Sequence, residues 1–237
     1  MCDYKCLSGS GLKLIAVFAM LIDHTAKGLL AGVPFFTTKI GCTSITPLWI
    51  LVSIGRIAFP IFAFLIVEGY LHTHNKRKYG MNLLLFAFIS EIPWNLVHKN
   101  SFFCPYQNVF FTLFLGYIGI CVIDYYKNIL KKQAIYLVLL FIASILCRAD
   151  YGCKGFGLIL LLYILREQRL YKSIIGSCFM TSTWRAGLAF IPIAMYNGER
   201  GFIQGKWMKY AFYLFYPLHL WVIYAIKLYL QSKSGIS

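Results

Sequence analysis

The sequence predicts an all-α integral membrane protein, a polytopic helical bundle of about nine transmembrane helices within a range of eight to ten. Of its 237 residues, 59% are hydrophobic and only 13% are charged, whereas about a quarter of the residues in a soluble domain are charged. The mean hydropathy is +0.68. One helix needs about 20 apolar residues to cross roughly 30 Å of hydrocarbon, so this length leaves almost no extramembrane domain. We therefore expect one domain, residues 1–237, with its function among the helices.

The candidate spans are the apolar runs that charged clusters, prolines and glycines separate. The runs at 155–165 and 187–196 are too short to cross upright, so each is extended by flanking residues or forms a half-helix buried in the bundle. Asp23 and His24, rather than a small-residue cleavage site, follow the first apolar stretch, which predicts a retained helix. In chain order the predicted helices occupy residues 12–32, 47–70, 81–98, 109–126, 133–147, 155–165, 172–184, 187–196 and 207–230.

The orientation follows from the basic residues. The chain carries 23 Lys and Arg against 8 Asp and Glu, a net charge of +15. By the positive-inside rule, loops rich in Lys and Arg face the cytoplasm and its anionic lipid, so the lipid bilayer is the expected partner and no nucleic acid is. The N-terminus is then cytoplasmic, and nine spans place the C-terminus outside. The clusters that alternate along the chain are Lys76–Arg77–Lys78, Lys127 with Lys131 and Lys132, Arg166 with Arg169 and Lys172, and Arg200 with Lys206 and Lys209.

The eight cysteines include no CxxC pair and no Cys/His spacing of a zinc site, so no metal is expected. Cys42, Cys104 and Cys153 fall in loops predicted to face away from the cytoplasm. A disulfide among these three is permitted there but not required.

Ionisable side chains inside spans are costly, and each is therefore a functional candidate. At 1.5 Å per residue, Asp23 and His24 lie about 16–18 Å from the cytoplasmic start of the first helix, and Glu91 about 15 Å into the third. Arg56 lies about 12–14 Å into the second helix from outside, and His219 about 14–18 Å into the last. The sequence thus predicts that four helices bring these five side chains to one depth near the bilayer midplane.

Two interpretations of this group remain open. The charges can simply pair and hold the bundle together, for example Asp23 with Lys27 one turn later, or Arg56 with Glu91. The two histidines favour proton transfer instead, because imidazole titrates near neutral pH. Pro60 and Pro217 lie near Arg56 and His219, and a proline within an apolar helical run predicts bent helical geometry there.

A second polar group lies near the outer face. Its members line a substrate entrance, with Asp23 below them, or they are interfacial anchors in which Arg148 pairs with Asp150, and the two interpretations weigh about equally. At the opposite end, Glu68 and His72 are one turn apart and form a solvated pair or the mouth of a site for a cytosolic ligand. The outer group comprises Asn108, Thr112, Arg148, Asp150, Tyr151 and Arg185.

Six segments resemble the TraX family of membrane proteins in order and content, over about Leu12 to Leu220. They are LKLIAVFAMLIDHTAKGL, IGRIAFPIFAFLIVEGYLHTHNKRKY, ISEIPWNL, RADYG, IAMYNGERG and FYLFYPLHL. The resemblance implies a bacterial inner-membrane protein of the transmembrane acyltransferase superfamily, whose TraX member acetylates the N-terminus of conjugative pilin. Acetyl-CoA from the cytoplasm is the implied donor, and the acceptor lies toward the other face. The family motifs fall here on His24 in IDH, Arg56 in GRIAFP, Glu91 in SEIP and His219 in FYPLHL.

The expected reaction is acetyl transfer to an amine or, less favoured, a hydroxyl. His24 is the expected general base and Glu91 the residue that fixes its imidazole. Arg56 is expected to stabilise the oxyanion, and His219 to carry a second proton or a transient acetyl group. Five cations are expected to bind the CoA phosphates at the cytoplasmic mouth, although the positive-inside rule alone predicts them too: Lys76, Arg77, Lys78, Arg200 and Lys206.

Two rival functions remain. A proton-coupled transporter or channel uses midplane Asp, Glu and His in bent helices equally naturally, although the chain contains no repeat typical of transporters. A purely structural subunit would leave two midplane histidines without a purpose. The sequence contains no Gly-rich phosphate loop and no GxSxG motif, so soluble acetyltransferase and hydrolase templates do not apply.

Overall fold

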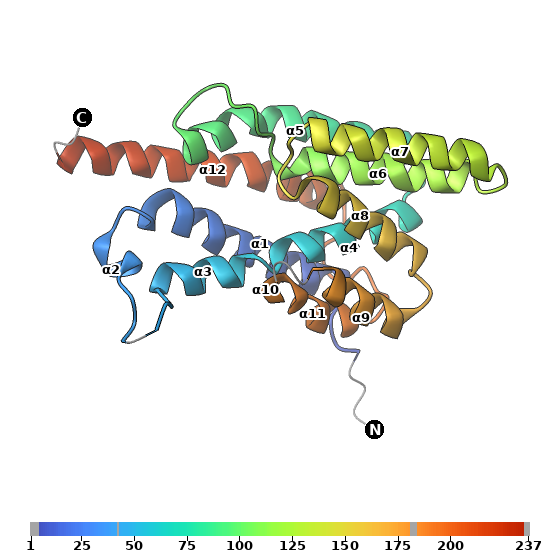
Figure 1. Cartoon of the computed structure of the whole chain (residues 1–237), viewed down its shortest axis with the longest axis horizontal. Coiled ribbons are helices and arrows are strands. Elements are labelled where there is room, and N and C mark those ends of the chain that lie inside the picture. The colour runs from blue at the N-terminus through green and yellow to red at the C-terminus, as the bar shows by residue number, and fades with distance from the viewer. Residues whose placement is uncertain (1–4, 42, 181–183, 235–237) are drawn as a thin grey trace.

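The computed structural model describes residues 5–41, 43–180 and 184–234, and these are helical apart from loops and two isolated β-bridges (Figure 1). In chain order the elements are α1 Gly9–Thr25, the π-helical turn η1 Ala26–Leu30, α2 Pro34–Thr37, α3 Pro47–Gly55, α4 Ala58–His72, α5 Lys76–Lys99, α6 Val109–Tyr125, α7 Leu130–Leu146, α8 Gly152–Ile164, α9 Arg169–Phe179, α10 Trp184–Gly187, α11 Phe190–Ala194 and α12 Lys206–Ser234.

The all-α prediction is confirmed for the described residues, but the count of nine spans is not. By length and composition, three helical segments of the described chain can each cross a membrane: Pro47–His72, Lys76–Lys99 and Trp207–Lys233. The segments Val109–Tyr125, Gly152–Ile164 and Trp184–Ala194 are apolar but shorter. The chain is thus a helical membrane protein in which several apolar helices are too short to cross alone.

The predicted helix at 47–70 is interrupted, because α3 ends at Gly55 and α4 begins at Ala58. Arg56 and Ile57 between them keep right-handed helical φ and ψ, so the two helices still form one segment. Pro60 explains the break. Proline has no N–H to donate to the carbonyl of Arg56, and its ring would collide with that carbonyl in a continuous helix. In the first turn of a new helix, the missing N–H costs nothing. α12, by contrast, runs through Pro217 without interruption.

The long helices α5, α6, α7 and α12 follow the long axis of the molecule, and α4 and α8 cross beneath them (Figure 1). α6 packs against α5, α7 and α8, while α1 packs against α3 and α4. Close approach of α6 and α8 requires glycine, since a Cβ on Gly116 would lie 2.4 Å from Cδ1 of Ile159. α12 packs against α5 and against α1, which places the last turns of α1 and α5 beside the middle of α12.

Candidate functional site

Two buried histidines from opposite ends of the chain form a pair. Nδ1 of His24, in the last turn of α1, lies 2.7 Å from Nε2 of His219 in α12. Their rings are almost parallel, with an interplanar angle of 2°. The side chains are 8% and 6% exposed, so both lie inside the bundle.

A backbone carbonyl decides which nitrogen of each ring carries the proton. Nδ1 of His219 lies 2.8 Å from the carbonyl oxygen of Phe215, to which it must donate. In the neutral pair, Nε2 of His219 is then an acceptor, and His24 donates to it through Nδ1–H. Nε2 of His24 consequently keeps its lone pair, which is the form that a general base requires.

Two residues that the sequence analysis did not single out complete this group. The ring of His98, near the end of α5, lies 5.4 Å from that of His24, edge to face. Tyr216 lies edge to face with both His24 (5.7 Å) and His219 (5.6 Å). His98 follows Glu91 by seven residues and so lies on the same helix face, a spacing that would have identified it. We call His24, His98, His219 and Tyr216 the histidine cluster.

Charged groups surround the histidine cluster toward the predicted outer side. Lys27 donates to Asp23 at 2.5 Å, as the pairing interpretation predicted. Arg56, in the break between α3 and α4, interacts electrostatically with Tyr151, Asp23 and Asp150. Oδ1 of Asp23 and Nε of Arg56 are buried without a hydrogen-bond partner among the described residues. Because unpaired buried polar atoms are costly, these two atoms are candidates for contact with a ligand.

Glu91 does not orient His24 as the sequence analysis expected, because its contacts are with Asn108. Oε2 of Glu91 accepts from Nδ2 of Asn108 at 2.6 Å and from its backbone N–H at 3.3 Å. Asn108 is the N-cap of α6, whose first turn is therefore fixed to α5. His219 takes the orienting position beside His24. Oε1 of Glu91 remains unpaired within the described chain.

The loop before α8 approaches the same region. Its backbone pairs with the loop before α6, where Asp150 donates to the carbonyl of Gln107 at 2.9 Å. The hydroxyl of Thr112 donates to the carbonyl of Asp150. Tyr151 has a φ of 66°, a conformation that costs a non-glycine residue on the order of 1–3 kcal/mol and that clusters at functional sites. Its ring stacks on Phe59 at 3.8 Å.

The other predicted entrance residues lie apart from the cluster. Arg148 is exposed and has a φ of 47°. Arg185 donates to Ser53 at 2.8 Å and lies over the ring of Trp49, in a small groove between α3 and α10. Cys104 and Cys153 are free thiols, and Cys42 lies outside the described residues.

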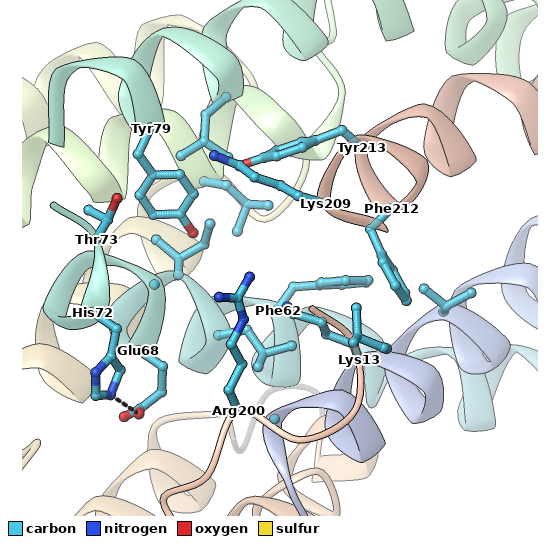
Figure 2. A pocket seen from close by; sticks show the side chains of 18 of the residues that line it. Lys13, Phe62, Glu68, His72, Thr73, Tyr79, Arg200, Lys209, Phe212 and Tyr213 are labelled. Carbon is cyan, nitrogen blue, oxygen red and sulfur yellow. Dashed lines mark ion pairs between the residues drawn. The ribbon is translucent and has the colours of Figure 1, made fainter. Parts of the chain in front are cut away.

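A cavity of about 550 Å³ opens where α1 and α12 begin, the end predicted to be cytoplasmic (Figure 2). Its walls are largely apolar, and Glu68 and His72, whose side chains lie 3.6 Å apart, are among the polar residues that line it. Tyr216 lines the cavity together with Val109 and Phe110. The cavity therefore extends to the residue that packs on both His24 and His219. Three cations line it: Lys13, Arg200 and Lys209.

Of the five predicted phosphate-binding cations, only Arg200 belongs to this lining as described. Lys76 instead donates to Asp124 and to the hydroxyl of Tyr70, each at 2.9 Å. Arg77 and Lys78 are exposed outside the lining, and the side chain of Lys206 lies outside the described part of the chain. Lys13 and Lys209 were missed. Each lies in the first turns of a predicted span, where a cation can reach inward.

Comparison with known proteins decides the family, since the model of the TraX protein family matches residues 8–227. The chain belongs to the TraX family. A protein of Dichelobacter nodosus described as "probable fimbrial assembly protein FimC, serogroup H1" is 28% identical over 250 residues, covering 93% of this chain and 96% of that protein. An uncharacterized protein of Rickettsia prowazekii is 26% identical over 204 residues, covering 78% and 68% respectively. No solved structure matches.

Proposed function

We propose that this TraX protein is a membrane-embedded acyltransferase that moves an acetyl group from acetyl-CoA to an amine. The observation that carries the proposal is the His24–His219 pair, which leaves Nε2 of His24 as a free base. Proximity of this base to a cavity with a basic lining supports it further. Membership of the TraX family and the fimbrial assembly name of one relative point in the same direction.

The cavity suits the acyl end of the donor. Ligand sites usually measure about 300–1,000 Å³ and are mostly apolar with a few polar groups. A volume of about 550 Å³ accommodates the acetylated pantetheine arm, and the nucleotide would remain at the mouth. The phosphates of CoA would then meet Lys13, Arg200 and Lys209, which replace most of the cations expected from the sequence.

The acceptor would approach from the charged side of the histidine cluster. The unpaired carboxylate oxygens of Asp23 and Glu91 suit a protonated amine better than a neutral hydroxyl. In this reaction Nε2 of His24 takes the proton of the attacking amine, and His219 steadies the imidazolium through Nδ1–H of His24. Arg56 supports the oxyanion. An acetyl-His219 intermediate is disfavoured, because its Nε2 already accepts from His24.

The protein would lie in the bacterial inner membrane with a cytoplasmic N-terminus, taking acetyl-CoA from inside. The acceptor amine would be on the other side, as the N-terminus of a pilin or of another exported chain is.

Release of free CoA thiol tests this function. Purified protein in nanodiscs receives acetyl-CoA and a panel of amines that includes pilin-like N-terminal peptides. We expect acceptor-stimulated thiol release that His24→Ala abolishes and that His74→Ala, at an exposed histidine, leaves intact. Absence of both thiol release and acetyl-CoA binding would refute the enzyme. Proton-driven uptake in vesicles would then identify the rival transporter.

A further inference from the structure

Tyr216 contacts both the cavity and the other members of the histidine cluster. Its side chain is 3% exposed and lines the cavity. The same ring packs edge to face on His24, His219 and Phe110, with the Phe110 centroid at 5.1 Å. Tyr216 thus borders the space in which we place the donor and also contacts the base that would activate the acceptor.

The hydroxyl of Tyr216 interacts electrostatically with three carboxylates, those of Asp150, Glu91 and Asp23. The backbone N–H of Val109 is a hydrogen-bond donor beside its oxygen. The hydroxyl is fully buried, and its own hydrogen has no acceptor among the described residues. Buried tyrosine hydroxyls normally have a partner, so this O–H is available to a ligand.

We propose that Tyr216 is a catalytic residue at the inner end of the cavity, where its ring limits the access of water and its phenol donates a hydrogen bond to the carbonyl oxygen of the donor thioester. This inference rests on the proposed acyltransferase function and adds a residue to it. It also assigns two separate tasks to one side chain, because the ring excludes water while the hydroxyl stabilises charge.

The ammonium form of the acceptor first releases one proton to water. The neutral amine nitrogen then attacks the thioester carbonyl carbon, and the oxygen of that carbonyl gains negative charge, which the phenol hydrogen bond stabilises. The amine proton passes to Nε2 of His24. When the tetrahedral intermediate collapses, the C–S bond breaks, the C–N bond remains, and His24 returns the proton to the CoA sulfur. Tyr216 ends the cycle unchanged.

The test compares Tyr216→Phe with Tyr224→Phe, both measured by acceptor-dependent thiol release in nanodiscs. Tyr224 lies on the same helix, outside the described lining of the cavity, and packs against Trp221 with ring centroids 6.3 Å apart, so it is a control for loss of one hydroxyl from α12. We expect kcat of Tyr216→Phe to fall about 10²–10³-fold, as for loss of one oxyanion donor. KM for acetyl-CoA should change less than about threefold, since the ring remains. Tyr224→Phe should keep kcat within about twofold.

Tyr216→Ala tests the ring separately. Without the ring, water reaches the thioester, and we expect hydrolysis of acetyl-CoA without an acceptor to rise at least about tenfold over wild type and Tyr216→Phe. A Tyr216→Phe protein that keeps more than about a third of wild-type kcat overturns the phenol assignment. A Tyr216→Ala protein without extra hydrolysis overturns the partition. A wild-type protein that releases no thiol refutes the acyltransferase itself, and this inference with it. Elution and thermal unfolding of each variant establish that it is folded.

Discussion

Two clusters of polar side chains lie between the helices, and they differ in how completely their hydrogen bonds are formed. Where α4, α5 and α6 meet near the predicted cytoplasmic face, Tyr70 donates to Asp124 at 2.7 Å and Lys76 donates to both. Tyr117 donates to the backbone carbonyl of Lys76 at 2.7 Å. We call these four residues the α4–α6 clamp. Its donors and acceptors satisfy one another.

The histidine cluster and its charged surroundings are incomplete by comparison. One oxygen of Asp23, one of Glu91 and Nε of Arg56 have no partner among the described residues. Burying such groups costs about 1–3 kcal/mol each, so a region that keeps several of them is suited to a ligand rather than to stability. The α4–α6 clamp thus fixes helices to one another, whereas we expect the histidine cluster and its unpaired surroundings to bind a ligand.

The sharpest test of this contrast is removal of the base. His24→Ala should lower kcat for acetyl transfer by about 10²–10⁴-fold, the usual contribution of a general base. Steady-state thiol release measures it. A large loss of kcat without a large drop in the unfolding temperature supports a catalytic site. A large drop in the unfolding temperature with little loss of kcat would give His24 a structural role like that of the α4–α6 clamp.

The next largest effect is expected at the mouth of the cavity. Arg200→Gln should raise KM for acetyl-CoA about tenfold at low ionic strength, and the effect should shrink as salt is added, because the charge is exposed and screened. Titration of the initial rate at two salt concentrations measures this. Equal KM values for Arg200→Gln and wild type at low salt would remove Arg200 from the donor site.

Tyr117→Phe removes one hydroxyl from the α4–α6 clamp, just as Tyr216→Phe removes one from the histidine cluster. The Tyr117 side chain is 1% exposed, and loss of its hydrogen bond should cost about 1 kcal/mol of stability. For a chain of this size that lowers the unfolding temperature by about 2–4 °C. We expect kcat to stay near wild type. A kcat loss as large as that of Tyr216→Phe would erase the distinction between the two clusters.

The smallest effect is expected at Lys78, which the sequence analysis placed in the donor site. Its exposed side chain lies outside the described lining of the cavity. Lys78→Gln should leave KM for acetyl-CoA within about twofold of wild type, in the same assay as Arg200→Gln. A tenfold rise in KM for acetyl-CoA would instead support Lys78 as a phosphate-binding residue and place the CoA phosphates at the start of α5.

Much of the fold could be read from the sequence because helix positions depend on local features. Apolar runs, prolines and glycines located most of the longer helices to within about five residues, whereas the short helices α2 and α10 were not predicted and α3 and α4 were predicted as one helix. Pro60 is the local signal for the break at Arg56. The number of spans could not be read in the same way. A helix forms its backbone hydrogen bonds internally, whether it spans the membrane by itself or is a short segment buried among other helices. Composition therefore does not show which of these arrangements the short apolar helices α8 and α11 adopt.

For the site, the sequence by itself predicted that Asp23, His24 and His219 share one level, from a fixed rise per residue. The contact between His24 and His219 confirms a common level for the two histidines. Only the tertiary structure decided which side chains face one another, because the rotation and tilt of each helix depend on packing against the others. That packing gave His24 a histidine partner instead of Glu91 and bound Lys76 to Asp124. It also brought Lys13 and Lys209, far apart in the chain, to one cavity.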